Sequence, residues 1–368
     1  MKTPSSSAGH GKTLIVHVGD HKTGSTSIQN AFASGRVTLP GHSVLYPGNL
    51  DHNYLSEHVT KLAKGGPLPA GRPGLPGLER IAARLAESDA DFCLLSGESF
   101  EGVAPEALQM AIDKLLAPHV SDIRIVAYIR PHAGRILSTY SEQTKIGWFQ
   151  GDPVEMFQRT LKSERFFYAP RLRRWREVFG ARFIARPMAR DVLHNRSVVD
   201  DFVQTAFGGL PFSIAPGDSG NESLSLEDLM LIKHVHAHLA KVNKGARLGF
   251  GWEIAQRLSA ADRPEPATRL ALHRTLARRI RKAYLADARA IDAEFFDGHG
   301  LFAGDLKNAV ETALPEPQSC NPEDYFSARE LRDIAVLADT LAGMLGRDKL
   351  NWPLWFRTRR AESLSDTV

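Results

Sequence analysis

A loop near the amino terminus contains the residue types that bind phosphate. From Gly19 to Ser27 the sequence reads GDHKTGSTS, and its single lysine is Lys22. Glycine lets the backbone approach an anion closely, a helix start offers free N–H groups, and lysine adds positive charge. The candidate binding residues are Lys22, Thr23, Gly24, Ser25, Thr26 and Ser27. Their spacing predicts a phosphate-binding loop.

The loop differs from the nucleotide-binding loop of kinases and NTPases. Gly19 and Gly24 keep the glycine spacing of GxxxxGK[ST], but Ser25 follows the second glycine and the lysine precedes it. A kinase or NTPase would also place a Mg²⁺-binding acidic residue at the end of a strand. Arg130 ends the most apolar strand instead. A P-loop kinase or NTPase therefore remains the alternative that the sequence favours less.

Arg130 and Ser138 form a second candidate anion site. Arg130 follows the expected strand 123–129, and Ser138 lies about two helical turns further on, about 12 Å along the axis. A guanidinium group has a fork geometry suited to phosphate, and a serine hydroxyl adds a short donor. Both side chains can meet only on a group held over the junction of strand and helix.

Glu98 is the candidate proton acceptor. It follows the expected strand 91–97, and α/β folds place their chemistry at the carboxyl ends of such strands. On position alone, an exposed loop glutamate, or a charge near the start of the helix expected at Pro105, explains it equally well. His21, in the loop, and His52, after the strand within 42–48, are further candidates. A residue that shapes the loop is the simpler interpretation of His21, and a solvated loop histidine is the simpler interpretation of His52.

Two segments resemble the sulfotransferases that use 3′-phosphoadenosine 5′-phosphosulfate (PAPS). The segment HKTGSTS with Ile28 and Gln29 is similar to their 5′-phosphosulfate loop, above all in bacterial members, with Ser25 where threonine is usual. The segment YIRPHAGRILSTYSEQTKIG is similar to their 3′-phosphate motif, in which Arg130 and Ser138 take part. The resemblance covers roughly residues 13–230 and implies a P-loop-like fold.

The resemblance also implies roles for individual residues. Lys22 and the loop residues Thr23 to Ser27 would hold the 5′-phosphosulfate, and Arg130 and Ser138 would hold the 3′-phosphate. Glu98 would accept the acceptor's proton during in-line transfer, with His21 and His52 as substitutes, and no metal would be needed. PAPS is the implied donor, its product is 3′,5′-adenosine bisphosphate (PAP), and Glu98 favours a carbohydrate hydroxyl as the acceptor. A sulfotransferase-like binding protein without catalysis is the other alternative.

The expected elements give an α/β fold with a central parallel sheet flanked by helices. Apolar strand-like runs at 14–18, 42–48, 91–97, 123–129 and 181–187 alternate with helical segments, whereas the Pro/Gly-rich stretch 64–77 predicts an irregular loop. The part from about 223 to 357 is expected to be helical. We therefore expect one domain over residues 13–357 with disordered tails at 1–12 and 358–368.

Composition limits the class of protein. The 368 residues include 43% apolar and 24% charged residues with a net charge of +4, and no apolar run reaches the length of a membrane span. Two cysteines and no signal-peptide core predict a cytoplasmic protein. The arginine-rich run 165–190 is typical of a half-solvated helix, with attraction of an anionic substrate as the next interpretation and nucleic-acid binding as the least favoured.

His234 and His238, four residues apart in an expected helix running from about Ser225 to Val242, raise the question of a metal site. A metal site usually has more ligands than one pair, so we expect a solvated helix face instead.

The sequence does not identify the acceptor, the oligomeric state, the role of the C-terminal helices, or whether Glu98 or a histidine is the base.

Overall fold

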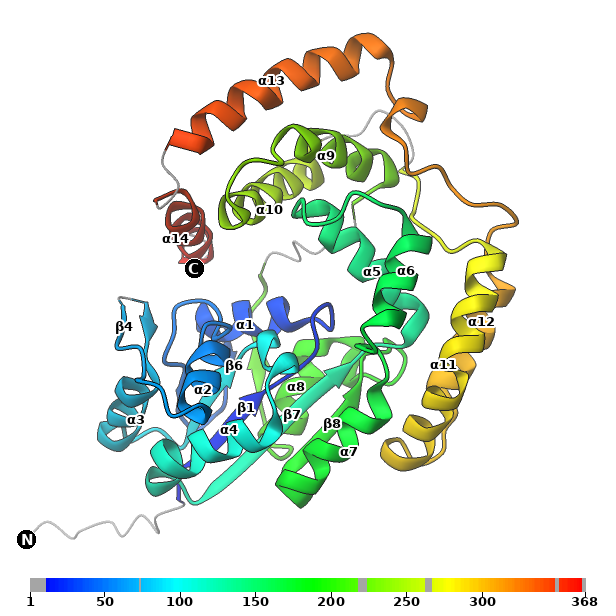
Figure 1. Cartoon of the computed structure of the whole chain (residues 1–368). Coiled ribbons are helices and arrows are strands. Elements are labelled where there is room, and N and C mark those ends of the chain that lie inside the picture. Colours follow the sequence, from blue (N-terminus) through cyan, green and yellow to red (C-terminus); the bar gives the residue numbers. More distant parts are fainter. Residues whose placement is uncertain (1–10, 73, 218–223, 262–266, 348–350, 366–368) are drawn as a thin grey trace, which may run out of the picture. The chain divides into compact units, whose positions relative to one another are not determined.

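The computed structural model describes residues 11–72, 74–217, 224–261, 267–347 and 351–365. They belong to two compact units (Figure 1). The first unit comprises Met1–Arg130 and Pro170–Gly217, and the second comprises Pro131–Ala169 and Asp218–Val368. Most of the tail expected at 1–12 lies outside the described residues.

A five-stranded parallel sheet forms the centre of the first unit. Its strands are β1 (Thr13–His17), β3 (Val44–Leu45), β6 (Phe92–Ser96), β7 (Asp122–Ile129) and β8 (Phe183–Pro187), in the order β3-β6-β1-β7-β8. His17 at the end of β1 is in register with Ser96 of β6 and Val126 of β7. The carboxyl ends of the three central strands therefore lie near one another. The prediction of an α/β fold with a central parallel sheet flanked by helices is confirmed.

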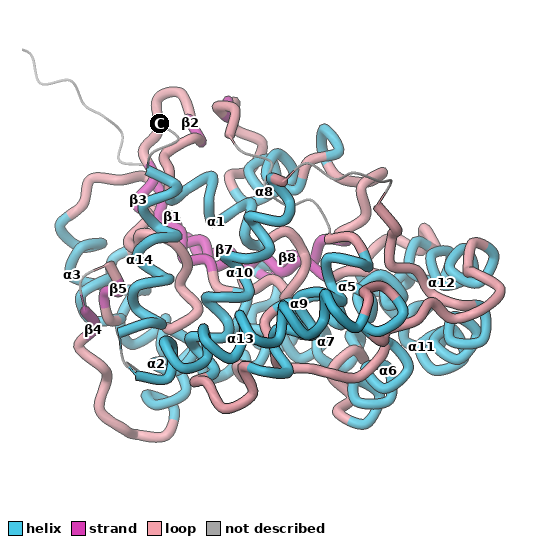
Figure 2. Tube along the Cα trace, turned by 90° about the horizontal axis from the view of Figure 1, so that it is seen from above, coloured by secondary structure: helices cyan, strands magenta, loops and turns pink. Residues whose placement is uncertain are grey.

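Helices cover both faces of this sheet, which is why its strands are continuous apolar runs. The first unit contains α1 (Ser25–Ala33), α2 (Leu55–Ala63), α3 (Leu78–Glu87), α4 (Pro105–Ala111), most of α7 (Tyr168–Phe179) and α8 (Val198–Ala206). Side chains of α1 and α8 share a core with Ile15, Leu94 and Val126. On the opposite face, Trp175 of α7 stacks on Phe183 of β8. Figure 2 marks the strands in magenta among the helices.

Several local expectations for the first unit differ from the structure. The stretch 64–77 includes a small hairpin of β4 (Gly71–Arg72) and β5 (Leu75–Pro76). A second pair joins β2 (Val37–Thr38) to β9 (Ser213–Ile214). Helix α8 begins at Val198, because the Ser197 side chain caps it by accepting from the Asp200 N–H.

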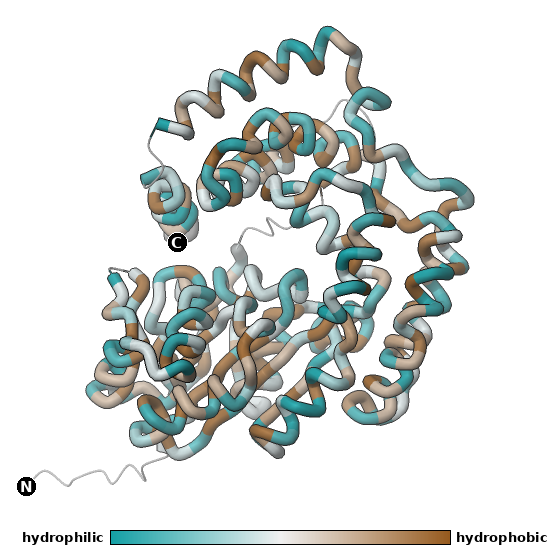
Figure 3. The backbone as a smooth tube through the Cα atoms, viewed as in Figure 1, coloured by the Kyte–Doolittle hydropathy of each residue, from teal (hydrophilic) through white to brown (hydrophobic). Residues whose placement is uncertain are grey.

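The second unit is built from helices. They are α5 (His132–Lys145), α6 (Pro153–Lys162), α9 (Leu226–His238), α10 (Lys244–Ala260), α11 (Arg274–Phe295), α12 (Leu301–Glu311), α13 (Ala328–Arg347) and α14 (Asn351–Ser365). Ser225 caps α9 by accepting from the Asp228 N–H at 3.0 Å, and α9 ends at His238, before the expected end at about Val242. Apolar and polar segments alternate along α13 (Figure 3). Its buried Ala338 and Leu345 pack with Trp352 and Phe356 of α14, which explains a helix where a disordered tail from 358 is expected.

A buried ion pair joins α5 and α11 of the second unit. Asp287 of α11 lies 3.0 Å from His132 Nε2 at the start of α5. The same carboxylate accepts the backbone N–H groups of Tyr168 and Ala169, both at 2.9 Å. It thus satisfies two free donors at the start of α7.

Within the described ranges, none of the helices combines the length and the apolar character that crossing a membrane requires.

Candidate functional site

The loop between β1 and α1 has an unusual backbone. Lys22 has φ 65° and Gly24 has φ 83°, so both adopt the left-handed conformation. This conformation is costly for lysine, and such residues concentrate at functional sites. Gly24 must be glycine, because a Cβ there would lie 2.8 Å from Val198 Cγ1. Ser25, the first residue of α1, follows at once, so the free N–H groups of this helix start face the loop.

Asp20 organises the base of the loop. Its carbonyl oxygen accepts the Thr23 hydroxyl at 2.6 Å and the Ser25 hydroxyl at 3.4 Å. Thr23 and Ser25 are buried, so in this structure their hydroxyls shape the loop. Lys22, Thr26 and Ser27 are only half-buried. Among the side chains of the candidate binding residues, those three are therefore the most accessible to a ligand.

Arg171 of α7 is a site residue that the sequence analysis missed. Its guanidinium contacts the buried Asp20 carboxylate with both terminal nitrogens, at 2.7 and 2.8 Å. Two parallel contacts fix the carboxylate more firmly than one. Arg171 lies within the arginine-rich run, but nothing in the sequence distinguishes it from its neighbours.

The rest of the arginine-rich run has varied partners. Arg174 forms an ion pair with Glu106 on the surface, and Arg186 forms one with the buried Asp201. Since several of these arginines already neutralise carboxylates, the run does not present a uniform basic surface for nucleic acid.

Arg130 lies beside the loop. It directly follows β7, and its Nη1 donates to the Lys22 carbonyl oxygen at 3.4 Å. The structure thus brings together Lys22 and Arg130, which are 108 residues apart. Ser138 is half-buried on α5 in the second unit, so its predicted pairing with Arg130 stays a prediction.

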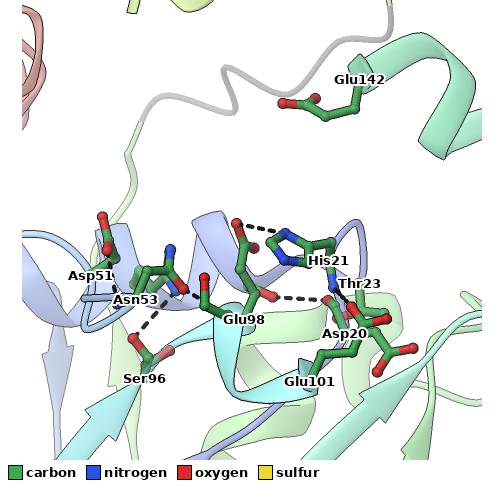
Figure 4. A network of polar contacts seen from close by, with 12 residues as sticks. Asp20, His21, Thr23, Asp51, Asn53, Ser96, Glu98, Glu101 and Glu142 are labelled. Carbon is green, nitrogen blue, oxygen red and sulfur yellow. Dashed lines mark hydrogen bonds and ion pairs between the residues drawn. The ribbon is translucent and has the colours of Figure 1, made fainter. Parts of the chain in front are cut away.

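Glu98 and His21 face each other at the same edge of the sheet (Figure 4). Glu98 begins a 3₁₀ turn, Glu98–Gly102, directly after β6, and its Oε1 lies 3.3 Å from His21 Nδ1. The side chains of His21 and Glu98 are 40% and 22% exposed. Glu101 of the same turn accepts the His21 backbone N–H at 3.2 Å. Glu98 does not belong to the first turn of α4, where Glu106 lies, so its explanation as a charge near that helix start is wrong.

His52 is fully buried, so its interpretation as a solvated loop histidine is wrong. Its Nδ1 accepts the Ser96 N–H at 3.1 Å, and its own backbone N–H donates to the Ser96 carbonyl at 2.8 Å. The loop after β3 packs against the end of β6, which removes the ring from solvent. This position favours a structural role for His52 over contact with an acceptor.

His17 packs beneath the loop between β1 and α1, and it is a second residue of this region that the sequence did not identify. It is fully buried at the end of β1, its Nδ1 lies 2.8 Å from Ser96 Oγ, and a side chain at Gly19 would collide with its Nε2. Burial lowers the pKa of His17 to about 4, so the ring is neutral near pH 7. A histidine within the apolar run LIVHV was the available sequence signal.

His234 and His238 contact α13. His234 Nε2 lies 2.9 Å from the Leu331 carbonyl oxygen, and His238 Nδ1 lies 3.0 Å from Asp339. The expectation of a solvated face is therefore wrong. Among the described residues, no group of three or more His, Cys, Asp or Glu side chains has the arrangement of a metal site.

The first unit is an α/β structure with a loop, an arginine and a histidine–carboxylate pair gathered at the carboxyl edge of a parallel sheet. Ligands of such sheets bind at this edge. Comparisons of the chain with protein-family models, with curated proteins and with solved structures find no match. The functional argument therefore depends on the site itself.

Proposed function

We propose that this chain is a PAPS-dependent sulfotransferase with a P-loop-like fold, which transfers a sulfuryl group to an acceptor hydroxyl, in our view that of a carbohydrate. The observation that carries the proposal is the contact of Arg130 with the Lys22 carbonyl. It places two cationic residues and a helix start at one sheet edge. PAPS carries anionic groups at both its 5′ and its 3′ positions, which suits two separate cations.

In this proposal the loop binds the 5′-phosphosulfate. The α1 N-terminus supplies backbone donors, the half-buried Thr26 and Ser27 add hydroxyls, and Lys22 supplies charge. As the bond to the leaving phosphate breaks, negative charge grows on that phosphate, and Lys22 stabilises it. The guanidinium of Arg130 binds the 3′-phosphate, with Ser138 as the proposed second donor.

The acceptor hydroxyl attacks sulfur in line with the leaving phosphate and gives up its proton. The Glu98–His21 pair is the proton acceptor in the proposal, because both side chains are partly exposed and adjacent to Lys22. In the proposal, catalysis comes from three contributions: the bound substrates are correctly positioned, Lys22 stabilises the charge on the leaving phosphate, and the Glu98–His21 pair accepts the proton.

A kinase or NTPase fits this site less well. Such a site needs lysine directly after the second glycine of the loop, whereas Ser25 stands there, and it needs an acidic residue after a strand to hold Mg²⁺. Arg130 follows β7, Asp20 is occupied by Arg171, and Glu98, which follows β6, contacts His21. A non-catalytic binding protein with the same donor site is the second candidate.

Isothermal titration of the full chain with PAP, and separately with ATP plus Mg²⁺, tests the proposal. We expect tight binding of PAP and much weaker binding of ATP. Lys22→Ala should weaken PAP binding by about 2 kcal/mol, about thirtyfold, because a charge-assisted contact is lost. Lys64→Ala removes an exposed lysine of the same unit and should leave binding unchanged.

The titration also separates the alternatives. Equal binding of PAP by wild type and Lys22→Ala would refute the assignment of the loop, and preference for ATP with Mg²⁺ would favour the kinase or NTPase. Tight PAP binding without any sulfuryl transfer to carbohydrate, phenolic or amine acceptors would favour the binding protein.

A further inference from the structure

His21, the residue before Lys22, contacts two glutamates of the 3₁₀ turn that follows the neighbouring strand β6. Glu101 accepts the backbone N–H of His21 at 3.2 Å, while Glu98 contacts the ring at Nδ1 at 3.3 Å (Figure 4). Both glutamates come from the Glu98–Gly102 turn after β6. This turn therefore positions the main chain and the ring of His21 independently.

We propose that His21 is the catalytic base, and that Glu98 is a positioning residue that holds the His21 ring. This inference rests on the proposed function and reverses the roles that the sequence alone suggests for the two residues. Contact at Nδ1 leaves Nε2, on the opposite side of the ring, to face the acceptor. The His21 side chain is also the more exposed of the two, at 40% against 22%.

The pair works as follows in the transfer step. Glu98 accepts the Nδ1–H of neutral His21, which fixes the tautomer with an unprotonated Nε2. Nε2 takes the proton of the acceptor hydroxyl as the acceptor oxygen bonds to sulfur. The sulfur–oxygen bond to the 5′-phosphate breaks, and its electron pair stays on that phosphate oxygen of PAP. The imidazolium that forms lies against the Glu98 carboxylate, which stabilises its charge.

The charged surroundings of His21 are compatible with this role. Glu101 lies 3.9 Å from Arg171, which also pairs with Asp20, so these charges partly compensate one another. Lys22 follows His21 in the chain, which keeps the base close to the group that contacts the phosphosulfate. The base and the site of charge stabilisation thus lie on consecutive residues of one loop.

A second histidine–carboxylate pair of the same unit provides a matched control. His42 Nδ1 lies 3.7 Å from Asp91, and these side chains are 33% and 36% exposed. Asp91 precedes β6, whereas Glu98 follows it, so this pair lies at the opposite edge of the sheet. Its chemistry is similar, but its position is remote from the loop.

The first experiment measures release of sulfate from PAPS with enzyme in excess and water as the acceptor. His21→Ala should lower the rate by about 10²- to 10⁴-fold, the usual contribution of a general base, and added imidazole should restore part of it. Glu98→Gln should lower the rate by about 10- to 100-fold, as expected for a group that orients a catalytic histidine, with no restoration by imidazole. His42→Ala should leave the rate within about twofold of wild type.

The second experiment reads the tautomer of the His21 ring directly. Long-range ¹H–¹⁵N correlation spectra at alkaline pH distinguish Nδ1–H from Nε2–H, and the signal that disappears in His21→Ala identifies the ring. We expect Nδ1–H in the wild type and in Glu101→Ala, which removes the acceptor of the backbone N–H and leaves the contact of Glu98 with the ring in place. Glu98→Gln should shift the ring towards the Nε2–H form. This measurement requires neither PAPS nor turnover.

Some results would overturn the inference without touching the proposed function. They are near-wild-type sulfate release by His21→Ala with complete loss in Glu98→Gln, or an Nε2–H tautomer in the wild type. No sulfate release by a wild type that binds PAP would overturn the inference and also favour the non-catalytic binding protein. Failure to bind PAP at all would instead overturn the proposed function. The two failures are therefore distinguishable.

Discussion

Two histidine–carboxylate pairs, one from each unit, differ in burial. His21 and Glu98 in the first unit lie 3.3 Å apart with side chains 40% and 22% exposed. His132 and Asp287 in the second unit lie 3.0 Å apart with side chains 0% and 3% exposed. Only the first pair is accessible to a substrate.

The partners of the carboxylates explain the difference. Asp287 also accepts the N–H groups of Tyr168 and Ala169, and the His132 ring stacks on Tyr284 with centroids 4.8 Å apart. A carboxylate with three donors inside a core holds helices together. Glu98 instead belongs to a short turn at the sheet edge, next to the loop. The same pair of residue types therefore serves the fold in one unit and, in our proposal, chemistry in the other.

The largest expected effect concerns the buried pair. Asp287→Ala removes three hydrogen bonds and leaves His132 without its partner, so the free energy of unfolding should fall by about 3–5 kcal/mol. Denaturant unfolding followed by circular dichroism measures this. Asp339→Ala is the matched control, because that aspartate pairs with His238 but is 67% exposed, and it should cost under about 1 kcal/mol. Equal costs for the two variants would contradict the structural role of Asp287.

Acid should destabilise the first unit through the buried His17. Its folded pKa of about 4 lies below the unfolded value of 6.5, so the unfolded state binds more protons between these values. This contribution is fully present above about pH 6.5 and is lost as the pH falls to 4, by about 3 kcal/mol. Stability measured at pH 7.5 and pH 4 should therefore differ less in His17→Gln than in wild type. An unchanged pH dependence would refute the neutral buried state.

A smaller effect should distinguish two ion pairs of α7. Arg171→Lys loses the two-point contact with buried Asp20 and loosens the loop, so PAP binding should weaken by about 2 kcal/mol. Arg174→Lys alters the surface pair with Glu106, whose side chains are 57% and 50% exposed, and should leave binding unchanged. Isothermal titration measures both. Similar affinities for the two variants would mean that Arg171 does not support the loop.

The features predictable from sequence are local ones. The strands around Leu14, Leu94 and Ile125 were recognisable because a parallel strand buried on both faces is a continuous apolar run. The loop after β1 and the arginine after β7 could then be expected at the same edge of the sheet, because the carboxyl ends of parallel strands lie at one edge. The position of each at the end of a strand therefore indicated that the loop and Arg130 lie close together.

The features that could not be predicted depend on pairs distant in sequence. Arg171 meets Asp20 across 151 residues, and His132 meets Asp287 across 155. Neither member of such a pair differs in type from many exposed residues, so only the fold identifies it. The bounds of α10, which lies in the part expected to be helical, could not be predicted for a local reason, because Gly245, Gly249 and Gly251 weaken a helical pattern. Gly251 is required by packing, since a Cβ there would collide with the Lys145 carbonyl.

The most direct test of the donor site is a thermodynamic cycle on the 3′-phosphate. Isothermal titration of wild type and Arg130→Ala with PAP and with 5′-AMP, which lacks the 3′-phosphate, gives four affinities. We predict that Arg130→Ala weakens PAP binding by about 2 kcal/mol and leaves 5′-AMP binding nearly unchanged, because in the proposal the 3′-phosphate is the part of the ligand that the guanidinium contacts. Equal losses for both ligands, or none for either, would contradict it.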